Sequence, residues 1–252
     1  MKQTCQQMKK NKALKFSILL IFIGIATVSF YYKAPIKRNL KKIYKERVDN
    51  STNTTSKEGD SLWGIDISHH QGSINWKVLV EKNRPDFIFL KATEGSTHID
   101  TKYSEYVKKS RELAIPVGAY HFFSYQSSGK DQAKNFIKNS KLIKGDIYPV
   151  LDVEYTKGMK DKTWIINEIK AFCKEIKKEY GVDPIIYCEC DYYTKFLKND
   201  FKNFSYWISD LYREPGCDYI IWQYTDRGFV HGIGNIDNNR FNKNTNIKNY
   251  RF

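Results

Sequence analysis

Two carboxylates end one short apolar segment of the chain. Asp152 and Glu154 close the segment Tyr148–Glu154, with only Val153 between them. In a β-strand, residues two apart point to the same face, with Cα atoms about 6.5 to 7 Å apart. Such a pair cannot ionise freely in a partly desolvated site, so the pKa of one carboxyl should rise toward that of a general acid. Acids at strand ends also act as caps and ion-pair partners, so the pair alone leaves chemistry and structure equally open.

Two further acids are expected at the same place. Asp66 interrupts the apolar segment Gly64–Ser68, and Asp237 ends the segment Gly234–Asp237. The first and last strands of a closed barrel are neighbours, so Asp66 and Asp237 should lie side by side. Four acids at one rim favour acid–base chemistry over a purely structural role.

Aromatic and polar side chains stand near the ends of other apolar segments. The residues expected to line a cleft and bind substrate are Tyr120, His121, Tyr187, Trp207, Trp222, Gln223 and Tyr224. Each aromatic could equally belong to the core, but together with the acids they suit sugar rings, which stack on aromatic faces and exchange hydrogen bonds. The 5 histidines have no metal-binding spacing, and no glycine-rich phosphate loop or Gly-x-Ser-x-Gly elbow occurs. The sequence therefore predicts neither a metal nor a cofactor.

The elements that must position these residues follow from the hydrophobic pattern. From Trp63 onward, short apolar runs alternate with amphipathic stretches of helical period, which predicts βα units and a mainly parallel sheet. The expected strands are Gly64–Ser68, Phe87–Ala92, Val117–Phe123, Tyr148–Glu154, Pro184–Cys190, Tyr206–Leu211, Tyr219–Tyr224 and Gly234–Asp237. The expected helices are Trp76–Lys82, Tyr103–Leu113, Asp131–Leu142, Lys162–Tyr180 and Tyr192–Leu197.

The gaps after the sixth expected strand are too short for helices. The pattern therefore predicts an α/β fold, an irregular TIM-like barrel of five βα units followed by three strands, (β/α)5(β)3. In such barrels reactive groups gather at the C-terminal ends of the strands, which is where the four acids are expected.

The N-terminal part of the chain has a different character. Residues 16–32 are an almost uninterrupted apolar run preceded by lysines, which predicts a secretory signal or a signal anchor. No small-x-small cleavage site ends the run, so a single-pass membrane anchor is favoured over cleavage and secretion. The expected parts are a basic cytoplasmic tail (1–15), a transmembrane signal anchor (16–32), a polar linker (33–60) and a catalytic domain (61–252) on the extracytoplasmic side of the cell membrane.

Charge and cysteine content exclude some partners. The formal net charge is +14, which favours polyanions at long range, but the basic residues are scattered and match no nucleic-acid-binding motif. Nucleic acid is therefore disfavoured. Cys188 and Cys190 lack the Cys-x-x-Cys spacing and are assigned no chemistry. Pairing between Cys173 and Cys217, and the oligomeric state, stay open.

Six segments in order resemble glycoside hydrolase family 25, the muramidases that include the Chalaropsis-type and phage-type lysozymes. The segments are Gly64–Gly72, Phe89–Gly95, Gly118–Phe122, Leu151–Glu154, Trp222–Thr225 and Gly234–Asn239. The resemblance covers about residues 63–242, the whole expected barrel. It implies hydrolysis of the β-1,4 bond between N-acetylmuramic acid and N-acetylglucosamine in the glycan strands of peptidoglycan.

The resemblance also implies roles for the four acids. Glu154 matches the proton donor of the family, and Asp152, Asp66 and Asp237 match its supporting acids. A route through the substrate's own acetamido group is favoured, with Asp152 orienting the acetamido nitrogen, while inversion through an activated water stays open. The sequence departs from the family at Asp210, which is expected to meet a nearby lysine.

Two other functions remain as alternatives. A chitinase-like hydrolase of another N-acetylated glycan would favour the series Asp-x-x-Asp-x-Asp-x-Glu, which residues 145–154 do not contain. A non-catalytic glycan-binding module would be expected to lose Glu154 or a neighbouring acid, and all four acids are present.

Overall fold

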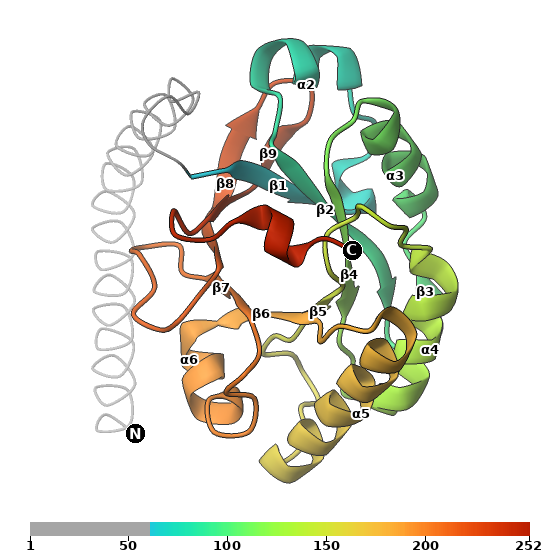
Figure 1. The fold of residues 1–252 in the computed structure, drawn as a ribbon, viewed down its shortest axis with the longest axis vertical. Helices are drawn as coiled ribbons and strands as arrows, with labels where there is room; N and C mark the ends of the chain where they lie inside the picture. The colour runs from blue at the N-terminus through green and yellow to red at the C-terminus, as the bar shows by residue number, and fades with distance from the viewer. Residues whose placement is uncertain (1–60) are drawn as a thin grey trace, which may run out of the picture. The chain divides into compact units, whose positions relative to one another are not determined.

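Nine strands join into one sheet that closes on itself (Figure 1). The computed structural model describes residues 61–252, and the predicted tail, anchor and linker lie outside them. The strands are β1 (Trp63–Ile67), β2 (Phe87–Glu94), β3 (His98–Ile99), β4 (Val117–Phe122), β5 (Val150–Asp152), β6 (Ile185–Glu189), β7 (Tyr206–Ser209), β8 (Ile221–Val230) and β9 (Gly234–Phe241). Their order is β1-β9-β8-β7-β6-β5-β4-β2-β3, and the pairing of β1 with β2 closes the barrel.

The strand directions confirm the predicted (β/α)5(β)3 barrel. Neighbouring strands are parallel from β1 through β2 and β4 round to β8. Only β9 runs against both of its neighbours, β8 and β1, in this part of the chain. A β8–β9 hairpin can therefore close the ring without a crossover helix, because antiparallel strands need only a short turn. Both hairpin strands run longer than expected from the sequence.

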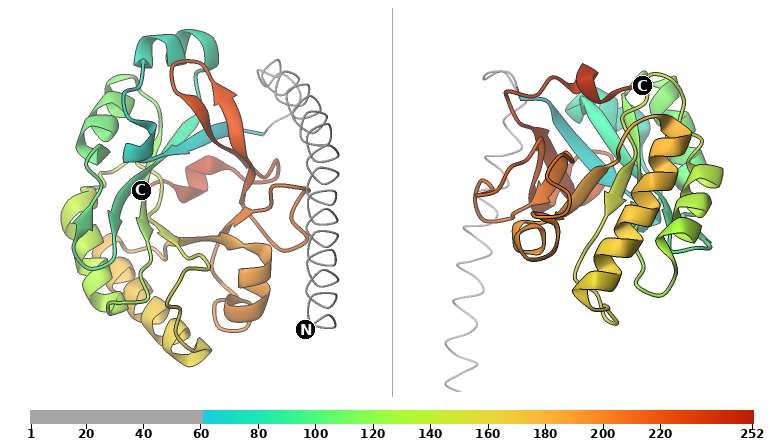
Figure 2. Two further views of the ribbon diagram at one scale, coloured as in Figure 1. Left: turned by 180° about the vertical axis from the view of Figure 1, so that it is seen from behind. Right: turned by 60° about the horizontal axis from the view of Figure 1, so that its bottom comes forward.

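The helices cover one side of the barrel more than the other. They are α2 (Trp76–Asn83), α3 (Tyr103–Glu112), α4 (Gly129–Ser140), α5 (Lys162–Tyr180) and α6 (Cys190–Tyr192), the last continued by a π-helical turn, η2 (Tyr193–Leu197). Helices α3, α4 and α5 lie along the β2–β6 side (Figures 1 and 2), and α2 meets the tip of the β8–β9 hairpin, where the backbone N–H of Asn75 donates to the Gly232 oxygen at 2.8 Å. Short 3₁₀ turns are η1 (His69–Gln71) and η3 (Ile247–Tyr250).

Local sequence explains the longest helix. Asp161 caps the first turn of α5 by accepting a hydrogen bond from the backbone N–H of Trp164, and Gly181 ends the helix in the left-handed conformation. Its apolar residues recur every three or four positions and are buried: Ile165, Ile169, Phe172, Cys173 and Ile176. This stripe packs the helix onto the barrel.

A separate apolar cluster fills the barrel interior near the N-terminal ends of the parallel strands and forms the floor of the barrel. Its aromatic members include Phe87, Phe89, Trp207 and Phe241, all almost fully buried. Glycines on the neighbouring strands make room for these rings. A Cβ atom at Gly64 would lie 2.4 Å from the ring of Phe87, and one at Gly118 would lie 2.2 Å from the ring of Phe89. The barrel is therefore a packed core at this level, closed to solvent.

The cysteine pairing differs from the candidate pair Cys173 and Cys217. Cys190, at the start of α6, forms a disulfide with Cys217 in the β7–β8 connection, with Cα atoms 6.1 Å apart. Cys173 and Cys188 are buried free thiols. Across residues 61–252, none of the helices combines the length and the apolar character that a membrane crossing requires.

Candidate active site

A cavity of about 320 Å³ opens at the C-terminal ends of the strands, directly above the aromatic floor of the barrel. It is lined by Asp66, Ser68, His70, Lys91, Glu94, Tyr120, Phe122, Asp152, Glu154, Tyr187, Trp207, Gln223 and Asp237. All four predicted acids are among these residues, together with Tyr120, Tyr187, Trp207 and Gln223 from the predicted aromatic and polar set. The strand-end rule therefore placed Asp152 and Glu154 correctly, whereas Asp237 lies within the antiparallel strand β9 and reaches the cavity beside its pairing partner Asp66.

Asp66 and Asp237 are direct partners across the β1–β9 pair, as predicted. Burial raises the pKa of Asp66 to about 6, against hydrogen bonds that favour its ionised form. Burial, followed by the nearby charge of Asp66, raises the pKa of Asp237 to about 8. Near neutral pH, Asp237 therefore holds a proton and hydrogen-bonds to the Asp66 carboxylate.

Two amides hold Asp66 in place. Its Oδ2 accepts hydrogen bonds from Asn239 Nδ2 at 2.7 Å and from Gln223 Nε2 at 3.1 Å. The carbonyl oxygen of Gln223 accepts in turn from Tyr187 Oη at 2.8 Å. The indole of Trp207 donates to Asn239 Oδ1 at 2.9 Å. This network fixes one wall of the cavity, because each amide uses its donor and its acceptor at once.

Asp152 and Glu154 stand on the wall formed by β5. Asp152 is the last residue of β5, and Glu154 lies two residues beyond it. Burial, and then the charge of Glu154, raises the pKa of Asp152 well above its ordinary value. Burial also raises the pKa of Glu154, followed by the charge of Glu189. The predicted rise in carboxyl pKa is thus present at both residues, and desolvation is its main cause.

One oxygen of Asp152 has no hydrogen-bond partner. Oδ1 is buried, and no atom of residues 61–252 donates to it. An unsatisfied buried acceptor is costly when it is charged, which agrees with burial as the largest cause of the raised pKa of Asp152.

Three predicted substrate-binding residues do not line the cavity. His121 is completely buried between the barrel and its helices, where it hydrogen-bonds Thr93 and Gln132 and stacks on Phe172. This burial lowers the pKa of His121 to about 4, so the ring is neutral. The reason is the two-residue period of a strand: Tyr120 faces the cavity, so its neighbour His121 must face outward.

The same alternation turns Trp222 and Tyr224 outward while Gln223 points inward. On the outer face of the barrel, the guanidinium of Arg240 lies 5.3 Å from the ring of Trp222 and 4.2 Å from the ring of Tyr224. These aromatics stabilise the hairpin through cation–π contacts and are not a sugar platform inside the cavity.

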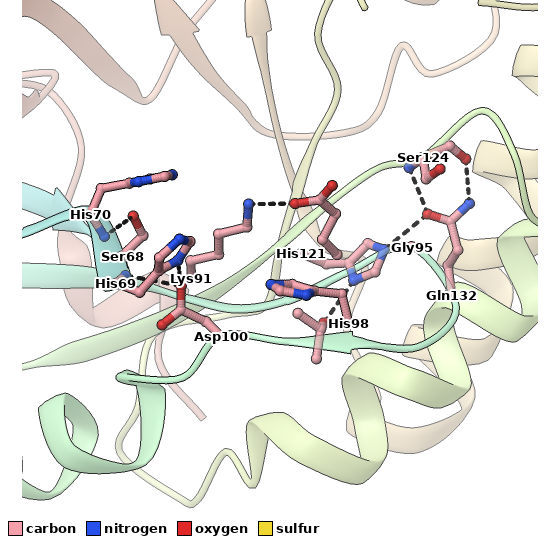
Figure 3. A network of polar contacts seen from close by, with 12 residues as sticks. Ser68, His69, His70, Lys91, Gly95, His98, Asp100, His121, Ser124 and Gln132 are labelled. Carbon is pink, nitrogen blue, oxygen red and sulfur yellow. Dashed lines mark hydrogen bonds and ion pairs between the residues drawn. The ribbon is translucent and has the colours of Figure 1, made fainter. Parts of the chain in front are cut away.

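Sequence reasoning missed several residues of the wall on the β1–β2 side, which Figure 3 shows. Lys91 lies on β2 and pairs with Glu94 at 2.7 Å, and His70 projects from η1 over the same edge. Ser68 and Phe122 complete this wall. The available signal was Lys91 itself, a charged residue inside the otherwise apolar run Phe87–Ala92.

Asp210 meets an arginine and backbone amides, contrary to the expected lysine. Its Oδ1 accepts from the backbone N–H groups of Tyr212 and Arg213, and Oδ2 lies 4.0 Å from Arg213 Nε. It shapes the β7–β8 loop and is not among the residues that line the cavity.

A second cavity, of about 240 Å³, opens at the N-terminal ends of the strands between Tyr148 and Tyr250. Its one carboxylate, Asp183, pairs with Lys177 at 2.7 Å, so no acid pair is available there. Within residues 61–252, no group of three or more His, Cys, Asp or Glu side chains is arranged to hold a metal ion.

A TIM-like barrel with clustered carboxylates at the C-terminal ends of its strands defines a class, the barrel glycosidases. The sequence profile of Glycosyl hydrolases family 25 matches residues 65–233. The chain belongs to this family and is a glycoside hydrolase.

Individual relatives agree with the family profile. YegX of Escherichia coli K12 is 31% identical over 255 residues, covering 94% of this chain and 93% of that protein. Lysozyme M1 of Streptomyces globisporus is 31% identical over 202 residues, covering 71% of this chain and 67% of that protein. The structure of a family 25 glycosyl hydrolase from Bacillus anthracis matches with a TM-score of 0.70 and 30% identity, covering 76% of this chain and 94% of that one.

Proposed function

We propose that the barrel is a lysozyme, a 1,4-β-N-acetylmuramidase that hydrolyses the bond between N-acetylmuramic acid and N-acetylglucosamine in peptidoglycan. The observation that carries the proposal is the pair Asp152 and Glu154, desolvated together at the cavity wall of a family 25 barrel. The similarity to Lysozyme M1 supports the same substrate.

Glu154 is the proton donor of the proposed reaction. Its raised pKa keeps a proton on the carboxyl group closer to neutral pH than an exposed glutamate would. The proton passes to the glycosidic oxygen as the bond to the anomeric carbon breaks, so the leaving sugar departs as a neutral alcohol. The resulting Glu154 carboxylate then takes a proton from the water that enters.

Asp152 positions the group that attacks the anomeric carbon. Its carboxyl lines the cavity and can accept the N–H of the substrate's 2-acetamido group, which makes the acetamido oxygen a better nucleophile. That oxygen bonds to the anomeric carbon as the leaving group departs, forming a cyclic oxazolinium intermediate. Water activated by Glu154 then opens the ring, and no covalent bond to the enzyme is needed.

Asp66 and Asp237 support this step electrostatically. Asp66 is the ionised member of the pair near neutral pH, and its charge is among the causes that raise the pKa of both Asp152 and Glu154. The negative charge also stabilises the positive charge that develops on the sugar ring in the transition state.

Product analysis tests the cleavage specificity. Purified peptidoglycan digested with the protein is reduced with borohydride, and the new reducing ends are identified by mass spectrometry. Reduced muramic acid is the expected result. Reduced glucosamine would mean cleavage of the other glycosidic bond, and the absence of new ends would contradict hydrolysis altogether.

We also propose that residues 16–32 retain the protein in the cell membrane with the barrel on the extracytoplasmic side. The support is the apolar run with its preceding lysines and the lack of a cleavage site. Membranes from producing cells should hold the intact chain until detergent is added, and protease added outside intact cells stripped of wall should remove the barrel. A shortened chain in the medium would contradict retention.

A further inference from the structure

Lys91 places an ammonium group in a cavity whose charged lining residues are mostly acids. The residue is only 9% exposed, although it carries an ammonium group that is costly to bury. Its Nζ lies 2.7 Å from Glu94 Oε2 and 4.7 Å from the centre of the Phe122 ring. The other basic residue that lines the cavity is His70. The five lining acids are Asp66, Glu94, Asp152, Glu154 and Asp237.

The ion pair with Glu94 does not by itself account for this placement. Lys102 and Glu105 form the same kind of pair, three residues apart and 2.7 Å long, on the surface of the protein. A surface position gives such a pair its modest stability without burying a charge. The Lys91 ammonium also has three N–H donors, of which Glu94 takes one, so donors remain for a ligand in the cavity.

Hydrogen bonds hold the wall around Lys91, several of which Figure 3 draws. Asp100 accepts hydrogen bonds from the backbone N–H of His69 at 2.9 Å and of Lys102 at 2.9 Å, and it pairs with His69 Nδ1 at 2.7 Å. These contacts tie the β1–η1 turn to the segment after β3. Ser68 caps η1, which fixes His70 at the edge of the cavity. A ligand group bound here would meet preorganised donors.

The substrate of the proposed function carries a matching acceptor. N-acetylmuramic acid differs from N-acetylglucosamine by a lactyl ether whose carboxyl group is a carboxylate when free and an amide when it carries a stem peptide. Either form presents an acceptor oxygen, which an ammonium N–H can satisfy and which an ionised carboxylate such as Asp66 would repel or leave unpaired. We propose that Lys91 donates a hydrogen bond to this lactyl oxygen and so selects muramic acid over glucosamine; the inference rests on the proposed muramidase function.

A competing role for Lys91 is to change the pKa values of the cavity acids without contacting the substrate. Its positive charge is among the influences that lower the pKa of Asp152 and of Glu154. Removing it would change the protonation of these acids for every substrate alike. A ratio of affinities for two sugars that differ only in the lactyl group cancels this shared effect.

The test measures binding to the full chain carrying Glu154→Gln, so that the ligands are not cut. The probes are a GlcNAc–MurNAc tetrasaccharide with free lactyl carboxylates, the same tetrasaccharide amidated with L-alaninamide, which adds no new carboxylate, and chitotetraose, which lacks the lactyl group. Calorimetry gives each Kd in the Glu154→Gln background, with Lys91→Met, with Lys91→Arg, and with Lys102→Met as the matched control. Thermal unfolding verifies that each variant is folded.

A hydrogen bond from an ammonium predicts that Lys91→Met reduces the preference for the lactyl-bearing sugar over chitotetraose by about tenfold or more. Lys91→Arg should retain part of that preference, and Lys102→Met all of it. Equal loss for the free and amidated forms would identify the carbonyl oxygen as the acceptor, and loss for the free form alone the carboxylate. An unchanged ratio in Lys91→Met, or no preference in the parent chain, would overturn the proposal. Reduced glucosamine ends in the digestion experiment would instead refute the muramidase function itself.

Discussion

The barrel interior has two parts that are built from the same strands. The floor, near the N-terminal ends of the parallel strands, is apolar, and the cavity at their C-terminal ends is lined by charged side chains. On β2, Phe89 fills the floor and Lys91 lines the cavity two residues later. On β5, Val150 is in the floor and Asp152 in the cavity wall. The change from apolar to charged side chains thus takes place between two successive inward-facing residues of one strand. The floor lies directly beneath the acids, whose burial is the largest cause of their raised pKa values.

We expect the floor residues to determine the stability of the fold and the cavity residues to determine the activity. Substitutions in one half should therefore change one property and leave the other nearly intact. The variants below test this separation.

The largest effect on activity is expected from Glu154→Gln. Glutamine keeps the shape but cannot donate the proton, so wall-cleaving activity should fall by about a hundredfold or more while the thermal midpoint stays within a few degrees. Turbidity loss of a peptidoglycan suspension measures the rate. Glu179→Gln is the control, because Glu179 is exposed on α5 and is not among the cavity-lining residues. Near-normal activity of Glu154→Gln would exclude Glu154 as the acid.

The largest effect on stability is expected from Phe89→Ala. The ring is fully buried and stacks on Trp207 with centroids 4.6 Å apart. Its removal should lower the free energy of unfolding by about 3 to 5 kcal/mol, through lost transfer energy and an unfilled cavity. Denaturant unfolding measures the loss, and Phe229→Ala, at a 42% exposed ring, should cost far less. Equal costs at both positions would show that the floor is not the stabilising core.

A smaller, pH-dependent effect is expected from Asp237→Asn. The pKa of Asp237 rises from 3.8 to about 8 on folding, so the folded protein keeps this proton up to a higher pH than the unfolded chain does. Its contribution to stability is therefore greatest below about pH 4 and declines as the pH rises toward 8. Asparagine removes the ionisation, so the variant should gain more in thermal midpoint at pH 8 than at pH 5. An identical difference at both pH values would contradict the raised pKa.

The smallest effect is expected from Trp222→Phe, on the outer face of the barrel. The residue contacts Arg240 and donates from Nε1 to the backbone oxygen of Asp210, outside the cavity. Activity should change by less than about twofold, with a minor loss of stability. A turbidity assay beside Trp207→Phe, whose indole supports the Asn239 amide, makes the comparison. A larger loss of activity in Trp222→Phe would restore the outer aromatics as substrate contacts.

The sequence predicted a large part of the fold and of the site. The alternation of apolar runs with amphipathic stretches is a local property, and it identified eight of the nine strands, all but the two-residue β3, and the long helix Lys162–Tyr180. The acids were found because they interrupt or end apolar runs, and because parallel strands end at one rim. The neighbouring positions of Asp66 and Asp237 followed from closure alone.

Only the tertiary structure decided which face of each strand points into the barrel. His121 and Tyr120 are adjacent in sequence and both stand near a strand end, yet one is covered by helices and the other lines the cavity. The Cys190–Cys217 pairing and the position of Lys91 in the cavity wall likewise depend on the folded chain, which brings distant segments together. Burial of a side chain depends on all of its neighbours together. The sequence therefore determines which side chains can ionise, and the folded barrel determines how far burial raises the pKa of each acid.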